Sequence, residues 1–423
     1  MKRMFYVTAM LCTSVAMIAC SGEEKLPSNE EQNANKEEIM PEYKWQPAKA
    51  ISLTAEETVI NDGFNSFAWR FFEEAFTLDD QKDVLLSPLS LESDLSTLLC
   101  GVKGETREEL LRALGIDRLT DEAFANYLNT MAKGVEEADN MTRFASAHAL
   151  WYNKALTLDA TFDKKLRSER NVEVFPVTFG TEATQQINSW CAEKTYNRIT
   201  KLVEQTLPTD LMHLVNTVYF RSNWAKSFRQ TGKRTFTDAD GKTQQVETMW
   251  DTFSNVGYKN TNDYTMATLP FNNGAYSMFF ILPAKGKTVS ELASTLAQNA
   301  PDMQSINSIA SMELYIPKFE ANYQTFLTKT LQALGCQKLF SEGEDFTIFA
   351  DVHMPVDNII QKTFLKIDEK GAEAAAATDI IAYTSNEDPH PEKIVFDLNR
   401  PFIYGIVENS TRHPLFLGCK THF

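Results

Sequence analysis

Side chains able to do covalent or metal chemistry are few in this sequence, and they lie far apart. The six histidines are scattered, and no two of the six cysteines form a C-x-x-C pair. Motifs of the G-x-S-x-G, H-E-x-x-H and phosphate-loop types are missing, so no common nucleophilic, zinc-dependent or phosphoryl-transfer site can be assigned. A histidine outside such a motif is usually a core or surface residue. We therefore expect a protein that is not an enzyme and that uses neither a metal nor a cofactor.

Four cysteines follow the first 20 residues, and their spacing is irregular. They are Cys100, Cys191, Cys336 and Cys419, each in an apolar or helical context. Disulfide-rich frameworks show regular, paired cysteine spacing, which is missing here. We predict buried thiols.

The reactive group that the sequence does offer is a peptide bond in an exposed loop. Residues 383–392 are polar, rich in turn formers, and contain Pro389 and Pro391, which oppose regular structure. Loops of this composition are preferred sites of proteolytic nicking. The sequence therefore predicts a segment that proteases cut.

A run of small residues precedes this loop and has two interpretations. Four alanines follow Glu373, and alanine is the best helix former, so a short exposed helix is one of them. With a period of two, however, one face of the run carries almost no bulk and no charge, while Glu373, Asp379, Tyr383 and Ser385 lie on the other face. Such a segment suits a strand that enters a tightly packed sheet, and Gly371 supplies the backbone freedom of a pivot. The small face consists of Ala372, Ala374, Ala376, Thr378, Ile380, Ala382 and Thr384.

Four separated motifs resemble those of the serpin family, in the family's order. Residues 86–90 (LSPLS) with 104–110 (GETREEL) are similar to its second helix and the turn after it, and residues 214–220 with Trp224 resemble its central strand and tryptophan. Residues 369–378, here called the hinge, are similar to its hinge, and residues 396–406 (FDLNRPFIYGI) to its C-terminal signature. The hinge comprises Glu369, Lys370, Gly371, Ala372, Glu373, Ala374, Ala375, Ala376, Ala377 and Thr378.

The resemblance implies an α+β serpin fold, with helices packed on three β-sheets and an exposed reactive loop at about residues 371–393. In the serpins, the equivalents of Ser87, Ser90 and Asn216 lie where the central sheet opens, and we place Trp224 in the same sheet-opening region. The plainer interpretation of the three polar residues is helix capping and core hydrogen bonding, and both interpretations can hold together.

The mechanism that the resemblance implies uses the chemistry of the target protease. The protease attacks the loop and forms an acyl-enzyme, the hinge inserts as a new strand, and the enzyme is dragged along and trapped. Members of the family that do not inhibit commonly carry charge, proline or bulk in the hinge, whereas Ala374 to Ala377 are small. We therefore expect an inhibitor, and keep a non-inhibitory binding or chaperone-like surface protein as the alternative.

The family's usual spacing places the cleaved bond 14 residues after Gly371, between Ser385 and Asn386. The loop before Phe396 is longer than in the commonest members, so Tyr383, Thr384 and Asn386 remain rival positions. No lysine or arginine lies between residues 370 and 393. We expect elastase-like or subtilisin-like serine proteases as targets, chymotrypsin-like ones if Tyr383 is used, and papain-like cysteine proteases stay open.

Local patterns predict the elements that must position the hinge. Phenylalanines between residues 64 and 76 recur at helical spacing, and Ser87 with Pro88 has the composition of a helix N-terminus. We expect further helices at residues 120–139 and 182–199, and strands at 144–152, 235–237, within 258–282, at 314–319 and at 356–367.

Residues 1–20 have the pattern of a bacterial lipoprotein signal peptide. Lys2 and Arg3 precede an apolar stretch that ends at Cys20, which would become the lipidated residue. An ordinary secretory signal with an incidental cysteine is the alternative. We expect a flexible tether at residues 21–55 and the serpin domain at residues 56–423. The expected location is the bacterial envelope, lipid-anchored at the outer membrane or cell surface or else extracellular, with periplasmic or outward orientation left open.

Composition excludes several partners. The chain has 423 residues, 43% of them hydrophobic, and a net charge of −16, which argues against nucleic acid and against docking on anionic lipid through a basic face. Between residues 120 and 139, Lys133 is the only basic residue, so we expect no heparin site. The expected partner is a target protease, bound covalently by a monomeric inhibitor.

Overall fold

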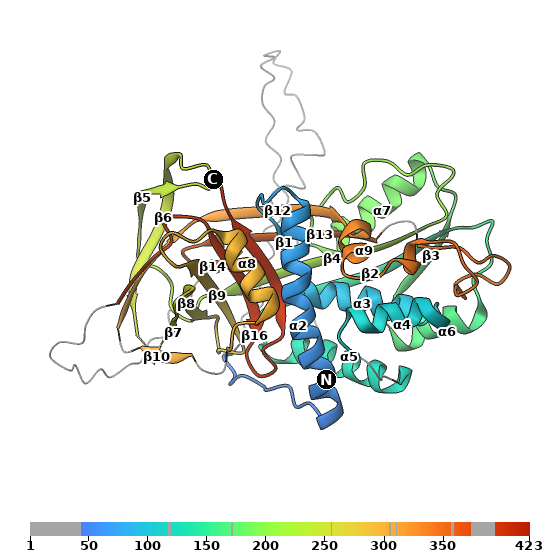
Figure 1. Ribbon diagram of the computed structural model, residues 1–423, viewed down its shortest axis with the longest axis horizontal. Coiled ribbons are helices and arrows are strands. Elements are labelled where there is room, and N and C mark those ends of the chain that lie inside the picture. The colour runs from blue at the N-terminus through green and yellow to red at the C-terminus, as the bar shows by residue number, and fades with distance from the viewer. Residues whose placement is uncertain are drawn as a thin grey trace, which may run out of the picture. The chain divides into compact units, whose positions relative to one another are not determined.

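The computed structural model describes residues 44–116, 120–170, 172–254, 256–303, 306–309, 311–356, 359–373 and 394–423 (Figure 1). Helices and three β-sheets form the part of the chain so described, which confirms the expected α+β class. The helices are α2 (Ala55–Leu78), α3 (Pro88–Leu99), α4 (Gly104–Ala113), α5 (Asp121–Glu137), α6 (Ala160–Glu169), α7 (Thr181–Lys194), α8 (Val289–Gln298), α9 (Thr328–Ala333) and the 3-10 helix η1 (Lys338–Phe340).

Helix α2 shows how local sequence becomes core. A capping box starts it, in which the Thr54 side chain accepts from the Glu57 N–H and the Glu57 carboxylate accepts from the Thr54 N–H. The predicted phenylalanine stripe is fully or almost fully buried. The stretch before α2, the end of the expected tether, also packs: the Lys49 N–H donates to the Ala138 carbonyl at 3.1 Å, and Ile51 is buried.

A seven-stranded and a four-stranded sheet make up one side of the molecule. The larger one has the order β1 (Leu85–Leu86), β17 (Pro414–Lys420), β16 (Phe402–Glu408), β9 (Tyr276–Pro283), β8 (Tyr264–Pro270), β7 (Val256–Asn260) and β10 (Asn307–Ile309). The smaller one has the order β15 (Ile394–Asp397), β11 (Met312–Pro317), β6 (Thr243–Phe253) and β5 (Gln230–Thr237). Strand β9 is buried along its whole length, as its apolar sequence predicts.

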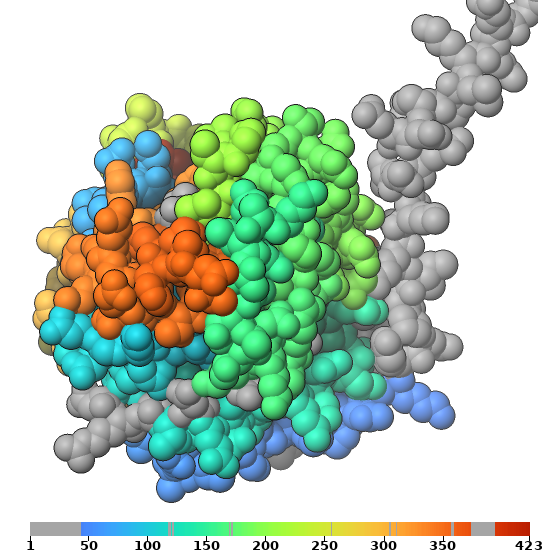
Figure 2. All heavy atoms as spheres, turned by 90° about the vertical axis from the view of Figure 1, so that its right-hand side faces the viewer, coloured from blue at the N-terminus to red at the C-terminus, as the bar shows by residue number. Residues whose placement is uncertain are grey.

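The six-stranded sheet, here called the central sheet, carries the hinge. Its order is β12 (Phe319–Phe326), β13 (Ile359–Asp368), β14 (Gly371–Ala372), β4 (Met212–Asn223), β2 (Arg143–Asn153) and β3 (Glu173–Val177). Successive residues of β4 enter different cores, with Leu214 and Val218 in the main one and Val215 in a second one that includes Ile187 and Trp190 of α7. The central sheet is therefore covered on both faces. Figure 2 shows the face on which the green segment containing β3 and α7 meets the orange segment that follows α9.

The predicted element boundaries differ from the observed ones where backbone geometry intervenes. The helix expected at 182–199 ends at Lys194, because Tyr196 and Asn197 adopt positive φ angles of 52° and 62°, which an α-helix cannot contain. The strand expected at 314–319 ends at Pro317, and Phe319 begins the next one. None of the described helices combines the length with the apolar composition needed to cross a membrane.

None of the four cysteines that the structure describes forms a disulfide. Cys191, Cys336 and Cys419 are buried, and Cys100 is half-buried. Burial raises the pKa of Cys191 and of Cys336 to about 12, and it raises the pKa of Cys419 as well. A thiol reacts through its thiolate, so these three should be inert in the folded protein.

Alkylation with iodoacetamide should therefore label Cys100 before the other three. In the native protein at neutral pH, peptide mapping by mass spectrometry should find Cys191, Cys336 and Cys419 unmodified until denaturant is added. Labelling of all four at similar rates in the folded protein would contradict the buried positions.

Candidate functional site

Strands β13 and β4 meet at a seam that is only partly closed. They pair in parallel over six residue pairs, from Ile359 opposite Leu214 to Phe364 opposite Tyr219. Beyond this seam the two strands separate, and β14 lies between them, antiparallel to both. The first residues after the Asp368–Lys370 turn are thus already a strand of the central sheet.

Gly371 occupies a position that admits only glycine. It pairs with Asp368 of β13 and with Asn223 of β4, at a φ of +156°. A Cβ there would lie 2.1 Å from the Ser222 carbonyl oxygen and 2.7 Å from the Asn223 Cα, both backbone atoms. Ala372, the next residue, is completely buried opposite Ser222 and Ile367. Small size is required at this point of entry because the backbones of two strands enclose it.

The rest of the hinge and the reactive loop lie outside the described residues. This holds for the expected bond at Ser385 and Asn386 and for the rivals Tyr383 and Thr384. It also holds for the hinge residues Ala374, Ala375, Ala376, Ala377 and Thr378, and for Cys20. The chain is described again from β15, which pairs in parallel with β11.

The period-two pattern predicted that Glu373 lies on the water-facing side of the strand. In the structure it does not. Its φ of 51° breaks the strand alternation, and the residue is 8% exposed. The Glu373 N–H donates to the Lys366 carbonyl at 2.9 Å, and the carboxylate forms an ion pair with Arg198, beyond the end of α7. Burial raises the pKa of Glu373, against the opposing effect of Arg198. The end of β14 is therefore tied to the segment that covers the sheet.

Glu369 stabilises the turn that precedes β14. Its carboxylate forms an ion pair with Lys318 at 3.0 Å, and its backbone carbonyl accepts from the Phe228 N–H at 2.9 Å. Burial opposes ionisation, but hydrogen bonds and the positive charge of Lys318 hold the pKa of Glu369 below its ordinary value. The two glutamates of the hinge therefore have pKa shifts of opposite sign.

Trp224 fastens the turn that leads into β14. Its indole Nε1 donates to the Asp368 carbonyl at 2.9 Å, and its backbone N–H donates to the Lys370 carbonyl at 2.9 Å. The ring stacks on Phe271 with centroids 4.5 Å apart. The tryptophan thus joins β4 to the turn between β13 and β14.

Polar groups line the underside of the seam. Ser87 caps α3, and its backbone exchanges two hydrogen bonds of 2.9 Å with the Gln361 side chain of β13, while its hydroxyl donates to the Leu415 carbonyl. Ser90 is buried beside it. Asn216 of β4 lies opposite Gln361 and donates to Asp94 of α3. Ser87 therefore caps α3 and also lies under the seam. The sequence had left open that both interpretations apply to it.

Sequence reasoning missed Gln361, Asp94 and His148. His148 of β2 lies opposite Asn216, which lies opposite Gln361, so the three form a row across the sheet. His148, Asn216 and Gln361 belong to three different strands, and no local motif links them. Strand register alone could have found the row.

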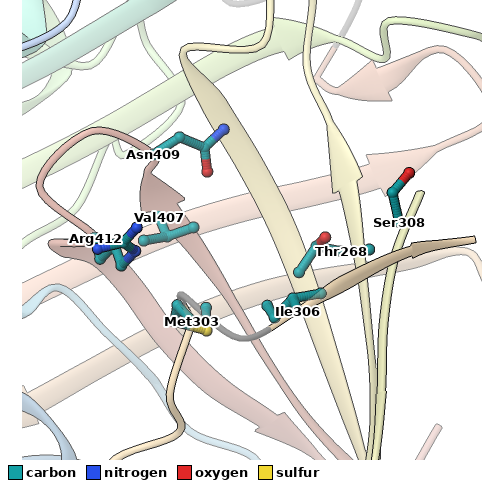
Figure 3. A pocket seen from close by; sticks show the side chains of 8 residues that line it. Thr268, Met303, Ile306, Ser308, Val407, Asn409 and Arg412 are labelled. Carbon is teal, nitrogen blue, oxygen red and sulfur yellow. The ribbon is translucent and has the colours of Figure 1, made fainter. Parts of the chain in front are cut away.

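A group of ionisable side chains and a cavity are two of the other places in the described chain that could hold a ligand. Carboxylate and imidazole atoms of Asp238, Asp240 and His422 lie within 4.8 Å of one another, but Asp240 already pairs with Lys242 at 3.0 Å. A cavity of about 200 Å³ lies by β7, β8 and the turn after β16 (Figure 3). Its lining residues are Gly257, Thr268, Met303, Ile306, Ser308, Val407, Asn409 and Arg412.

The opposite pKa shifts of the two hinge glutamates predict opposite effects of amidation. A raised native pKa penalises the folded state above the ordinary value of 4.5, so Glu373→Gln should raise the melting temperature at pH 7, and the gain should fade as the pH falls through the raised native pKa and be gone below 4.5. A lowered native pKa stabilises above that value, so Glu369→Gln, the matched control, should lower the melting temperature at pH 7 and should lose its effect on acidification.

Thermal scans at one fixed rate, at pH 7 and pH 4, measure both variants against the parent protein. A lower melting temperature of Glu373→Gln at pH 7 would mean that the ion pair with Arg198 outweighs the cost of burial.

Comparisons with known proteins agree with this geometry. The family model "Serpin (serine protease inhibitor)" matches residues 62–422. Among curated relatives, antitrypsin of Bombyx mori is 28% identical over 369 residues, covering 85% of this chain and 93% of its own length, and Iripin-5 of Ixodes ricinus is 27% identical over 355 residues, covering 81% and 89%.

Solved structures give the same result. Tengpin, a thermophilic serpin in its native state, superposes with a TM-score of 0.79 at 25% identity, covering 90% of this chain and 98% of its own. Human thyroxine-binding globulin superposes with a TM-score of 0.75 at 25% identity, covering 86% and 98%. From the family match over nearly the whole described chain, and from a hinge that enters the central sheet between β13 and β4, we conclude that the protein belongs to the serpin family.

Proposed function

We propose that this protein inhibits serine proteases by inserting its cleaved loop into the central sheet. The observation that carries the proposal is β14: Gly371 and Ala372 already lie between β13 and β4, antiparallel to both. A longer strand would continue in the same direction, along the line where β13 and β4 now pair directly. Family membership supports protease inhibition in general, and the entry of the hinge supports the insertion mechanism.

The proposed reaction starts at the bond between Ser385 and Asn386. The protease's nucleophile forms an ester with the carbonyl of Ser385, and the chain beginning at Asn386 leaves as the free amine. The hinge then extends β14, opening the six pairs of the seam in turn. About 14 residues at roughly 3.3 Å each carry the bound enzyme about 46 Å. Displacement of the catalytic groups by as little as about 1 Å slows deacylation, so the ester persists.

Side chains of the hinge support insertion over the alternative of a non-inhibitory binding protein. Ala372 is fully buried where it enters, and Ala374 to Ala377 continue with the same small residue. Thyroxine-binding globulin, a structural neighbour, was solved as a complex with its ligand. The described chain has a cavity of about 200 Å³ (Figure 3) and another of about 610 Å³ beside β2, so cavity size does not decide between the two functions, whereas the small side chains of the hinge do. We therefore place inhibition first.

Incubation with elastase should give a complex of protein and protease that survives boiling in detergent. Ala374→Arg should abolish this complex and leave fast cleavage, because a charge on the inserting face would have to be buried. Ala155→Arg, at an exposed position in the turn after β2, is the matched control and should form the complex like the parent. Mass spectrometry of the released C-terminal fragment identifies the cut bond.

Complete cleavage without a complex, across elastase, subtilisin, chymotrypsin and papain, would favour the non-inhibitory alternative. The same conclusion would follow if the cleaved protein melted at the temperature of the intact one, since insertion should add a paired strand and raise it.

We also propose that the inhibitor is a monomer anchored to the bacterial envelope through lipid on Cys20. The support is the sequence of residues 1–20, in which a basic start and an apolar stretch are followed by Ala19 and that cysteine. On phase separation with Triton X-114, protein expressed with its own signal should enter the detergent phase, and Cys20→Ala should stay in the aqueous phase. Equal partition of the two would mean that the signal is an ordinary secretory one.

A further inference from the structure

A chain of hydrogen-bonded side chains leads from the interior of the central sheet to a cavity on its flank. His148 Nδ1 lies 3.0 Å from the Oδ1 atom of Asp94, which is fully buried on α3. His148 Nε2 lies 2.9 Å from Ser146 Oγ. Ser146 and His148 are two residues apart on β2 and so lie on the same face of the strand.

With Asp94 ionised and the His148 ring neutral, the partners fix the direction of each hydrogen bond. Asn216 donates to the second carboxylate oxygen of Asp94, so an ionised Asp94 accepts from both sides. His148 must then donate from Nδ1, and in the neutral ring Nε2 becomes the acceptor. The hydroxyl of Ser146 therefore donates to His148. This is the order of hydroxyl, imidazole and carboxylate that activates a serine for nucleophilic attack.

Ser146 lines a cavity large enough for a small molecule. The cavity measures about 610 Å³ and lies between β2, α3, α5 and α7, with Ser146 and His148 in its wall. Leu89, Leu128 and Phe144 give it an apolar side. Ser146 is half-buried, whereas His148 is 9% exposed, so water reaches the hydroxyl more readily than the ring.

Strand β2 is an edge strand over the part that carries Ser146. Strand β3 pairs with β2 only at residues 149–153, so from residue 143 to 148 the edge of β2 that faces away from β4 has no strand beside it in the described chain. Every second N–H of such an edge points away from the paired strand.

We propose that Ser146 is a nucleophile that is acylated by small neutral esters entering this cavity. The Ser146 Oγ forms a bond to the acyl carbon, the ester C–O bond breaks, and the proton of Ser146 passes through His148 Nε2 to the departing alcohol. Asp94 is a positioning residue, because it acts through His148. The cavity wall carries side chains of both signs, the acidic Glu136, Glu173 and Glu193 and the basic Arg170 and Lys194, so it favours neither an anionic nor a cationic ester. The reaction involves no protease and does not depend on the proposed inhibitory function.

A fluorophosphonate probe tests the nucleophile in the full-length protein. Attack breaks the P–F bond, forms the bond between Ser146 Oγ and phosphorus, and releases fluoride. Peptide mapping should place one equivalent of probe on Ser146. Ser146→Ala should remove the label, and His148→Asn should slow labelling at least tenfold, since a general base typically contributes about 10²-fold or more.

Ser93→Ala is the matched control. Ser93 lies in the wall of the same cavity, but its hydroxyl donates to the Leu89 carbonyl at 3.3 Å, so this variant should label at the parent rate. No label on Ser146 in the folded protein, label on other serines, or an unchanged rate in His148→Asn would overturn the proposal. Peptide mapping of the label on the parent protein tests the proposal even if a variant fails to fold.

Asp94→Asn tests the positioning role. It should slow labelling and also change the tautomer of His148, which nitrogen NMR of the ring reports directly. The parent should show the proton on Nδ1, and the variant should shift it toward Nε2. A slower rate with an unchanged tautomer would assign Asp94 a structural role only.

Discussion

The pairing of β13 with β4 is the constraint on which the rest of the structure depends. Six parallel residue pairs join two strands whose other edges are held by longer ladders, eight pairs with β12 and ten with β2. Parallel pairing is slightly weaker per residue than antiparallel pairing. The central sheet can therefore part at this seam while its outer pairs stay intact. Strand β14 marks the end at which the parting has begun.

The cost of parting is set by the groups above and below the seam. On one face lie the apolar contacts of α7 with Ile360 and Phe364, and on the other the hydrogen bonds of Gln361 and Asn216 to α3. Buried polar groups that lose their partners cost more than apolar ones that shift. The hydrogen bonds of His148, Asn216 and Gln361 therefore oppose separation of the strands at the seam. The proposed acylation of Ser146 would occur next to His148, at the outer end of this row.

The hinge is held at its entry by two carboxylates with opposing energetics. Glu369 is stabilised in its ionised form by Lys318, outside the sheet, whereas Glu373 is penalised by burial beside Arg198. Extension of β14 would require Glu373 to leave its φ of 51° for a strand conformation, which changes its contact with Arg198. One charge therefore stabilises the present position of the hinge and the other destabilises it. Such a balance lowers the free energy needed to change its conformation, as an inserting strand requires.

Local physics in the sequence determined the capped start of α3 at Ser87, the aromatic stripe of α2, the buried strand β9 and the small residues of the hinge. Those features depend on neighbours a few residues away, so pattern and propensity suffice to predict them. Tertiary structure decided the burial of Glu373, the steric demand on Gly371 and the alignment of Asp94 with His148. These depend on strand register and on backbone approach between segments more than 50 residues apart, which no local pattern encodes.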